Sequence, residues 1–275
     1  MPQSISRTPS ATTIPSGSPN LGNTRFQNDP QLSGVLAGGT LASGAKGEGV
    51  KKLQQAFSDM GFAVQAPPDG AFGPQMQKSV RNFQVNAAKM FPQVRPTGIL
   101  DAATLKALDA LAPAAGQKGQ TKNIPAPLYD GKPVRVVVLK DEHRTFLFDK
   151  AGKLQNIYIN AVGKAATQTD GGLKVVTGKL NEAACNAAGE RLWGGRVFGP
   201  RMIDLSWVDG KHSGEELHGS NAPQQLGEDV SHGCVRHDNK DILAMYDILN
   251  VGDQVAIATG LNDPRLNGPA SSWVR

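Results

Sequence analysis

A thiol and several imidazole rings lie close together in the last quarter of the sequence. His218-Gly219-Ser220 is followed by Ser231-His232-Gly233-Cys234-Val235-Arg236-His237. A cysteine becomes a strong nucleophile when an adjacent imidazole takes its proton and the resulting imidazolium stabilises the thiolate. His218 and His232 are the rings that could do this for Cys234. Acyl transfer is the reaction class that uses such a pair.

The residues next to the two cysteines differ. Gly233 precedes Cys234, and its missing side chain lets a substrate carbonyl approach the backbone. The N–H groups of Gly233 and Cys234 could then form an oxyanion hole, in which each preorganised donor is typically worth ~3 kcal/mol. Cys185 lies in NEAACNAAGE, with no histidine nearby in sequence. We therefore predict that Cys234 is reactive and that Cys185 is structural or incidental.

A zinc site is an alternative interpretation of the same residues. His232, Cys234 and His237 are spaced by two and three residues, and His212 and His218 lie upstream. Structural zinc sites usually contain paired Cys or Cys/His ligands, and a catalytic zinc site would also need a carboxylate base, which this run lacks. We expect neither a metal nor another cofactor, and a zinc-dependent hydrolase is kept as the alternative.

The chain around this cluster has the pattern of a mostly β domain. Residues 135–139, 145–148 and 155–161 are rich in β-branched or alternating apolar residues and predict strands. Ile242, Met245, Tyr246 and Leu249 then share one face, which predicts a single late helix over 239–249 with Asn239 as its N-cap. A last strand is expected over 254–258.

Three helical patterns precede this domain. Their apolar stripes are Val50, Leu53 and Phe57, then Val80, Phe83 and Ala87, then Leu105, Leu108 and Leu111. Asp101 is placed to cap the third helix. Three short helices can enclose one small core, so we predict a small all-α domain.

Composition sets the expected boundaries. Ser, Thr, Pro and Gly occupy 21 of the first 40 positions, which predicts a flexible leader because few large apolar side chains are available to offset the entropy of ordering. We divide the chain into a leader (1–42), a helical domain (43–112), a Pro- and Gly-rich linker (113–132), a β-rich domain (133–259) and a C-terminal tail (260–275).

Charge and hydropathy exclude several classes of protein. The net charge is +5 and aromatic residues make up 5% of the chain, so the stacking platforms of single-strand binders are not expected, and neither is nucleic acid as a partner. No apolar stretch approaches the ~20 residues that cross a bilayer. The start of the chain also lacks the ~7 to 15 apolar residues of a secretory signal.

Both halves resemble known families. GVKKLQQAF, DGAFG and SVRNFQ are similar to the peptidoglycan-binding domain of the three-helix type, over about residues 43 to 112. The stretch HGSNAPQQLGEDVSHGCVRHDNKDILAMYDILNVGDQVAI resembles the signature of L,D-transpeptidases of the YkuD type, which are cysteine enzymes that remodel bacterial peptidoglycan. This second resemblance covers about residues 133 to 258.

The resemblance to L,D-transpeptidases implies roles for individual residues. Cys234 would be the nucleophile and His218 the general base, with the carbonyl of Gly219 holding the imidazole in the required tautomer. The supporting or substrate-binding residues would be His232, Arg236, Ser231, Ser220 and Asn239. For Arg236, binding of a substrate carboxylate and a buried ion pair near the cysteine are equally open.

Two positions depart from the family pattern. His237 stands where the family usually has an apolar residue, and we expect it to be a surface histidine or one with satisfied hydrogen bonds. Thr169-Asp170-Gly171-Gly172-Leu173 stands where the family has a Pro-Thr-Gly substrate loop. A different substrate preference is therefore expected.

The resemblance also implies a reaction on stem peptides and glycan. Cys234 would attack the amide between the diamino acid at stem position three and the terminal D-alanine, forming a thioacyl enzyme. A second stem, a free D-amino acid or water could resolve it, so transpeptidase, exchange and L,D-carboxypeptidase activities all stay open. The helical domain would raise the local substrate concentration through the linker. A non-catalytic wall-binding protein is the alternative from another class.

The expected site of action is the periplasm or cell wall. Because the start shows no secretory signal, we expect either delivery by a secretion machine or phage-mediated release, or else a chain that has been trimmed. Delivery into rival cells would make the protein an antibacterial effector with an immunity protein as partner. The sequence does not indicate an oligomeric state.

Overall fold

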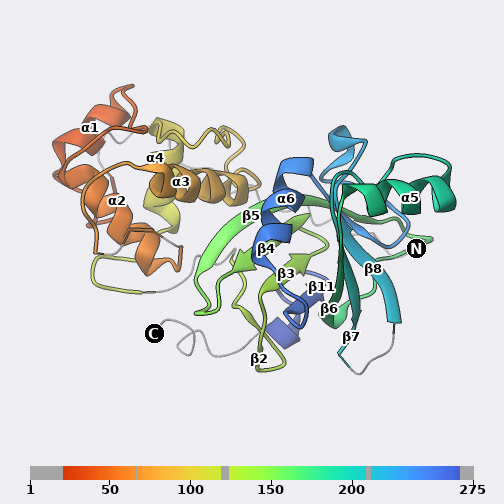
Figure 1. The fold of residues 1–275 in the computed structure, drawn as a ribbon. Helices are drawn as coiled ribbons and strands as arrows, with labels where there is room; N and C mark the ends of the chain where they lie inside the picture. Colours follow the sequence, from red (N-terminus) through yellow and green to blue (C-terminus); the bar gives the residue numbers. More distant parts are fainter. Residues whose placement is uncertain (1–20, 63, 66, 119–123, 209–211, 267–275) are drawn as a thin grey trace, which may run out of the picture.

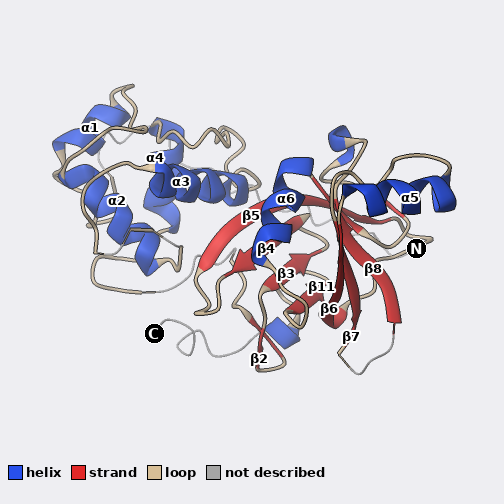
Figure 2. Cartoon of the chain, in the orientation of Figure 1, coloured by secondary structure: helices blue, strands red, loops and turns tan. Residues whose placement is uncertain are grey.

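A computed structural model describes residues 21–62, 64–65, 67–118, 124–208 and 212–266. The helices of the N-terminal half gather on one side of the molecule, and a large sheet with the later helices forms the other (Figures 1 and 2). No helix in these ranges combines the length and hydropathy that crossing a membrane requires.

The helical domain contains the three helices that the apolar stripes predicted. They are α2 (Glu48–Asp59), α3 (Pro74–Ala87) and α4 (Ala102–Leu111). The Asp101 carboxylate accepts the N–H of Thr104 at 2.8 Å, as expected for the N-cap of α4. The sequence thus predicted both the number of helices within 43–112 and the start of the last one.

The interpretation of residues 1–42 as a flexible leader is wrong for 21–42. These residues include α1 (Pro30–Leu36), capped by Asp29, and bury Phe26, Leu32 and Val35 in the same core as the other helices. The segment is rich in Ser, Gly and Pro, but its few large apolar side chains pack into the core formed by the other helices. Residues 1–20 lie outside the described residues.

The predicted linker and C-terminal tail also contain residues that pack against the two domains. The Arg25 guanidinium donates to the carbonyl oxygens of Pro113 and Ala114, and Tyr129 lies in a short hairpin of β1 (Leu128–Tyr129) and β2 (Lys132–Pro133). The tail begins with a short helix, η2 (Pro264–Leu266), in which Leu266 is buried. Residues 119–123 and 267–275 lie outside the described residues.

The C-terminal domain is a nine-stranded sheet in the order β10-β8-β7-β6-β11-β3-β4-β5-β9, and a further pairing of β10 with β5 closes it into a barrel. The strands are β3 (Val136–Leu139), β4 (Arg144–Phe148), β5 (Leu154–Gly163), β6 (Gly172–Leu180), β7 (Met202–Trp207), β8 (His212–His218), β9 (Asp229–Ser231), β10 (Val235–His237) and β11 (Gln254–Ala258). Closure therefore occurs at β10, the strand that directly follows Cys234.

Two helices accompany the barrel where the sequence predicted one. The late helix α6 (Asn239–Ile248) is present, but its N-cap is Asp238, whose carboxylate accepts the N–H of Lys240 at 2.9 Å. The assignment of Asn239 as N-cap was therefore wrong. The additional helix α5 (Glu182–Trp193) buries few residues and lacks a strong apolar stripe, so periodicity did not reveal it.

The two domains are packed directly against each other. The Asn82 side chain of α3 donates to the carbonyl oxygen of Gln155 at 3.1 Å and accepts the N–H of Ile157 at 3.2 Å. A single hydrophobic cluster runs from the helices into the sheet, where it includes Phe146 and Phe148. The helical domain is thus held in one orientation on the barrel, whereas we expected a tether.

We expect Asn82→Ala to lower the free energy of unfolding by about 2 kcal/mol, because it removes both hydrogen bonds to β5 and leaves a buried N–H of Ile157 without its partner. Urea denaturation of the full chain measures this. Gln75→Ala, at an exposed position of the same helix, is the control and should change the value by less than about 0.5 kcal/mol. If Asn82→Ala and Gln75→Ala lowered the free energy of unfolding equally, the hydrogen bonds of Asn82 to β5 would not be stabilising the protein.

Candidate active site

Cys234 directly precedes β10, which pairs with β8. The two strands are parallel, with Val235 opposite Leu217 and Arg236 opposite His218. Because side chains alternate along a strand, Cys234 and Arg236 share one face of β10. Cys234, Arg236 and His218 line one cavity of about 90 Å³. The predicted nucleophile and base therefore come together.

The tautomer of His218 follows from its hydrogen bond. Nδ1 lies 2.5 Å from the carbonyl oxygen of Gly219, which can only accept, so Nδ1 carries the proton and Nε2 is the basic nitrogen. Burial lowers the pKa of His218 to about 4, with the Arg236 charge contributing and the Gly219 carbonyl opposing. The ring is neutral near pH 7 and able to accept a proton.

The carboxylate of Glu216, which was not predicted from the sequence, contacts the Cys234 thiol. Cys234 Sγ donates to Glu216 Oε2 at 2.8 Å. Burial, followed by the Glu216 charge and hydrogen bond, raises the pKa of Cys234 well above its ordinary value, and Arg236 opposes this only weakly. The resting site therefore holds a protonated thiol and a neutral imidazole. The pairing of Glu216 with Cys234 depends on strand register, which the local sequence does not reveal.

The turn before Cys234 is held by Ser231. Its hydroxyl donates to the carbonyl oxygen of Cys234 at 2.6 Å and accepts the N–H of Gly233 at 3.2 Å. Gly233 has φ +118°, which favours glycine. The backbone conformation at this position therefore requires glycine. The Gly233 N–H is directed at Ser231, which differs from its predicted place in an oxyanion hole.

The turn after His218 is held by Asn239. Its Oδ1 accepts the N–H of Ser220 at 2.9 Å, and the Ser220 hydroxyl accepts the N–H of Ala222 at 3.0 Å. A Cβ at Gly219 would collide with the Asn239 side chain and crowd Pro200. Glycine is required at 219 because this close packing keeps its carbonyl against the imidazole.

His232 and Arg236 lie at the rim of the cavity. The His232 ring packs on Trp193 with 4.9 Å between ring centroids, and Trp193 at the end of α5 also lines the cavity. Arg236 contacts Gln225 Oε1 at 3.5 Å. Trp193 was not predicted because it lies 25 residues before His218 and 41 before Cys234, in a helix that the sequence did not predict.

His237 and Cys185 lie away from the reacting groups. His237 is buried, and its Nε2 is 2.9 Å from Thr145 Oγ1, so it is not a surface residue. Its Nδ1 is a buried atom without a hydrogen-bond partner. Cys185 is buried on α5, and burial raises the pKa of its thiol to about 11. Its burial is consistent with the prediction that Cys185 is structural or incidental.

The loop before β6 packs against the catalytic turn. Thr167 Oγ1 donates to the Ser231 carbonyl oxygen at 3.0 Å, and the Thr169 hydroxyl accepts the N–H of Gly163 at 2.9 Å. The Asp170 N–H donates to Glu215 Oε1, and Glu215 Oε2 pairs with the buried Lys174 at 3.1 Å. The predicted substrate loop thus adjoins the site and is anchored by an internal ion pair.

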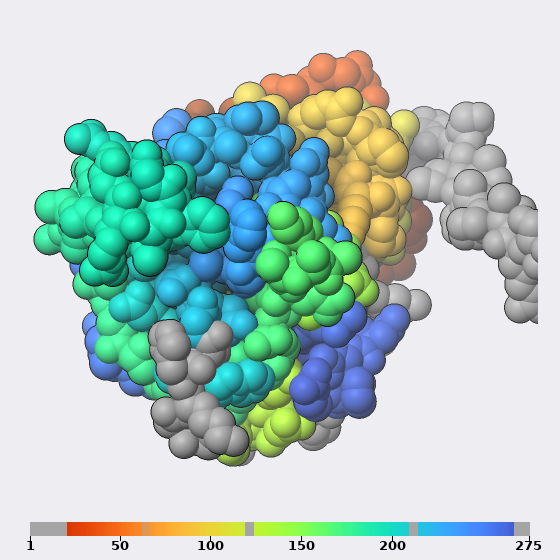
Figure 3. Space-filling view, turned by 90° about the vertical axis from the view of Figure 1, so that its right-hand side faces the viewer, coloured from red at the N-terminus to blue at the C-terminus, as the bar shows by residue number. Residues whose placement is uncertain are grey.

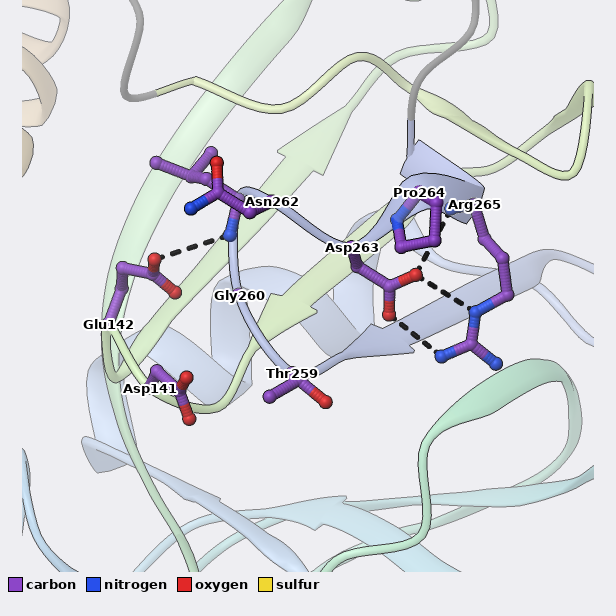
Figure 4. A pocket seen from close by; sticks show the side chains of 9 residues that line it. Asp141, Glu142, Thr259, Gly260, Asn262, Asp263, Pro264 and Arg265 are labelled. Atoms are coloured by element: carbon purple, nitrogen blue, oxygen red, sulfur yellow. Dashed lines mark hydrogen bonds and ion pairs between the residues drawn. The ribbon is translucent and has the colours of Figure 1, made fainter.

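Figure 3 shows this face of the molecule. The segment of α5 projects at one side, and segments near residues 165 and 230 meet beside it. A larger hollow of about 500 Å³ shares none of the catalytic residues (Figure 4). Two of its carboxylates have partners within the chain: Glu142 Oε1 accepts the N–H of Leu261 at 3.2 Å, and Asp263 pairs with Arg265 at 2.7 Å. No cysteine or histidine lines this hollow, so size alone does not identify the site.

Among the described residues, the geometry does not support the zinc alternative, and the side chain of His212 lies outside them. His237 is directed at Thr145, whereas His232 packs on Trp193 and the Cys234 thiol contacts Glu216. Within the described ranges, no three His, Cys, Asp or Glu side chains are arranged to hold a metal ion.

The two buried histidines should make the fold sensitive to acid. Burial lowers the pKa of His218 to about 4 and of His237 to about 3, from an ordinary 6.5. Below pH 6.5 the unfolded chain takes up protons that the folded chain does not, so stability falls as the pH drops towards 4 and then 3. Above pH 6.5 neither residue imposes this cost.

A His237→Gln variant isolates one of these contributions. Between pH 5.5 and 4, the free energy of unfolding of the unmodified protein should fall more steeply than that of the variant, by about 1.4 kcal/mol per pH unit. Urea titrations at several pH values measure both slopes. Identical slopes would show that His237 is protonated in the folded protein.

Comparison with known proteins identifies the class. Residues 133–257 match the L,D-transpeptidase catalytic domain of the YkuD family, and residues 46–108 match a peptidoglycan binding domain. The L,D-transpeptidase YkuD of Bacillus licheniformis is 31% identical over 128 residues, which are 46% of this chain and 67% of that protein. Its Bacillus subtilis namesake is 30% identical over 114 residues, 42% of this chain and 60% of that protein.

A solved L,D-transpeptidase structure from Xylanimonas cellulosilytica is 19% identical and covers 79% of this chain and 97% of that one, with a TM-score of 0.38. Because the chain matches these family models and the Bacillus relatives, the protein is a cysteine-dependent enzyme of the cell wall. The chain belongs to the L,D-transpeptidase family, and its helical domain binds peptidoglycan. It therefore modifies peptidoglycan and acts outside the cytoplasm.

Proposed function

We propose that Cys234 attacks the amide carbonyl between the diamino acid at stem position three and the terminal D-alanine. The observation that supports this most strongly is the cavity shared by Cys234 and His218, in which the Gly219 carbonyl leaves His218 Nε2 as the base. Nε2 takes the thiol proton as the sulfur attacks, and the C–N bond to D-alanine then breaks. The imidazolium protonates the departing amine.

Other groups would support this step. The Cys234 N–H is the remaining candidate for the oxyanion, because the Gly233 N–H is directed at Ser231. Arg236 lines the cavity, and its guanidinium fork suits a substrate carboxylate. Trp193 and Phe198 line the cavity with apolar surface. Together these residues would hold the acyl donor against the sulfur.

The helical domain would present the polymer in a fixed orientation. Asn82 and the shared hydrophobic cluster hold α3 on β5, so the peptidoglycan-binding domain is part of the same body as the barrel. Binding of glycan to the helices would then limit which stem peptides reach Cys234, as well as raising their local concentration.

Mass spectrometry of muropeptides tests the proposal. Purified sacculi rich in tetrapeptide stems are incubated with the protein and digested, and new cross-links, exchanged termini and tripeptides are measured. Cross-links form when a second stem is the acyl acceptor, exchanged termini when it is a free D-amino acid, and tripeptides when it is water. Cys234→Ala is the control. An unchanged muropeptide profile with the unmodified protein would refute the proposed reaction.

Delivery into rival cells as an antibacterial effector is a further hypothesis, and no residue of the described site argues for it. Periplasmic expression of the protein and of Cys234→Ala tests it. Unaffected growth and cell shape in both strains would refute a toxic role.

A further inference from the structure

The thiol of Cys234 lines a cavity and also contacts a carboxylate that is not among the lining residues. Cys234, His218 and Arg236 are among the cavity-lining residues, whereas Glu216 is not. Glu216 Oε2 nevertheless lies 2.8 Å from Sγ, because β8 and β10 run parallel with Leu217 opposite Val235. Glu216 is partly exposed. A second reactant could therefore approach the sulfur from the side of Glu216 while the acyl donor fills the cavity.

The carboxylate does not favour the first chemical step. A negative charge next to a thiol opposes formation of the thiolate, and a base for that step is already present in His218. The position of Glu216 is better explained by the second chemical step, in which an acceptor attacks the thioester and frees the enzyme. Three acceptors are chemically possible there, and two of them are amines that carry a positive charge near pH 7.

We propose that Glu216 binds the ammonium group of an amine acyl acceptor beside the Cys234 thioester and accepts one of its protons. This inference rests on the proposed function. Acylation removes the S–H group that donates to Glu216. An ammonium supplies N–H donors for the same oxygen, and a charge-assisted hydrogen bond is stronger than the one it replaces.

The geometry also favours attack by nitrogen. An amine hydrogen-bonded to Glu216 Oε2 would lie next to the sulfur and hence close to the thioester carbon, which a productive approach requires within about 3.5 Å. Water has no charge for the carboxylate to select. Glu216 should therefore favour transfer to an amine over hydrolysis.

The atoms balance as follows. The ammonium gives one proton to Glu216 and becomes a free amine, whose nitrogen attacks the thioester carbon. The C–N bond forms, the C–S bond breaks, and the second amine proton passes through His218 to the sulfur. An amide, a Cys234 thiol and one proton on Glu216 result, and that proton is released to solvent.

The ratio of exchange to hydrolysis measures this role. Disaccharide tetrapeptide is incubated with D-methionine, and the exchanged and tripeptide products are quantified by mass spectrometry. Glu216→Gln should lower the ratio at least tenfold and raise the D-methionine concentration needed for half-maximal exchange. Glu216→Asp should fall between Gln and the unmodified protein, because a carboxylate is kept.

Two controls separate this role from others. Asp204, on β7, is the cross-strand partner of Glu216, so Asp204→Asn removes the same charge nearby and should change the ratio less than twofold. Carbapenem adduct formation on Cys234 reports the acylation step alone, and it should persist in Glu216→Gln.

Two results would overturn the inference. A ratio within twofold of the unmodified value in Glu216→Gln would show that the carboxylate does not select the acceptor. Loss of the carbapenem adduct in that variant would show that Glu216 acts in acylation instead. Absence of both adduct and products in the unmodified protein is a different outcome, since it refutes the proposed function and this inference with it.

Discussion

Cys234→Ala should form no covalent adduct with a carbapenem and should release no measurable D-alanine from tetrapeptide stems. The sulfur is the atom that would carry the acyl group, so its removal is expected to lower turnover by at least about 10⁴-fold. Intact-mass analysis after carbapenem exposure measures the adduct, and chromatography of the stem peptides measures turnover.

The second cysteine provides the matched control. Cys185 is buried on α5, and its hydrogen bond is to the Leu180 carbonyl oxygen. Cys185→Ala should therefore retain one adduct per chain and most of the activity. An adduct on Cys234→Ala, or its loss from Cys185→Ala, would identify a different nucleophile.

His218→Ala should slow acylation by about 10² to 10⁴-fold, the usual contribution of a positioned general base. The thiol is protonated in the resting site, since burial and Glu216 raise the pKa of Cys234. Its proton therefore has to move during the attack, and without the imidazole this step loses its base. Stopped-flow measurement of carbapenem acylation gives the rate.

The pH profile of the same reaction tests the state of His218. Because burial lowers its pKa to about 4, the basic form persists well below pH 6.5. The protonation of His218 should therefore cause no loss of rate between pH 7 and 5.5, whereas an ordinary histidine would lose most of its basic form. A fall in rate centred near pH 6.5 would contradict a buried neutral ring.

His232→Ala is the control for removing an imidazole. The ring is exposed and packs on Trp193 at the cavity rim, so a change of less than about tenfold is expected. Equal losses in His218→Ala and His232→Ala would leave the identity of the base open to revision.

Local signals in the sequence predicted several parts of this protein correctly. Apolar stripes gave α2, α3 and α4, and β-branched runs gave β3, β4 and β5, because each depends on residues only two to four positions apart. The spacing of the motif indicated Cys234 and His218 as candidate site residues, and both line one cavity in the structure. Cys185, predicted to be structural or incidental, is buried on α5.

Other local signals were misleading. Composition suggested a flexible segment where Phe26, Leu32 and Val35 are buried, since a few apolar side chains suffice when a neighbouring core is available. Helix α5 has a weak apolar stripe because few of its residues are buried. Asn239 has the residue type of an N-cap, yet its side chain holds Ser220 and Asp238 caps the helix.

The sequence by itself determined the two families of domain and predicted Cys234 and His218 as nucleophile and base, since these depend on residue types at short spacing. Only the tertiary structure decided that Glu216 contacts the thiol, that Trp193 lines the cavity and that the helical domain is fixed on β5. Those contacts depend on strand register, barrel closure and domain packing. They join residues distant in sequence, or on neighbouring strands, whose pairing no local pattern specifies.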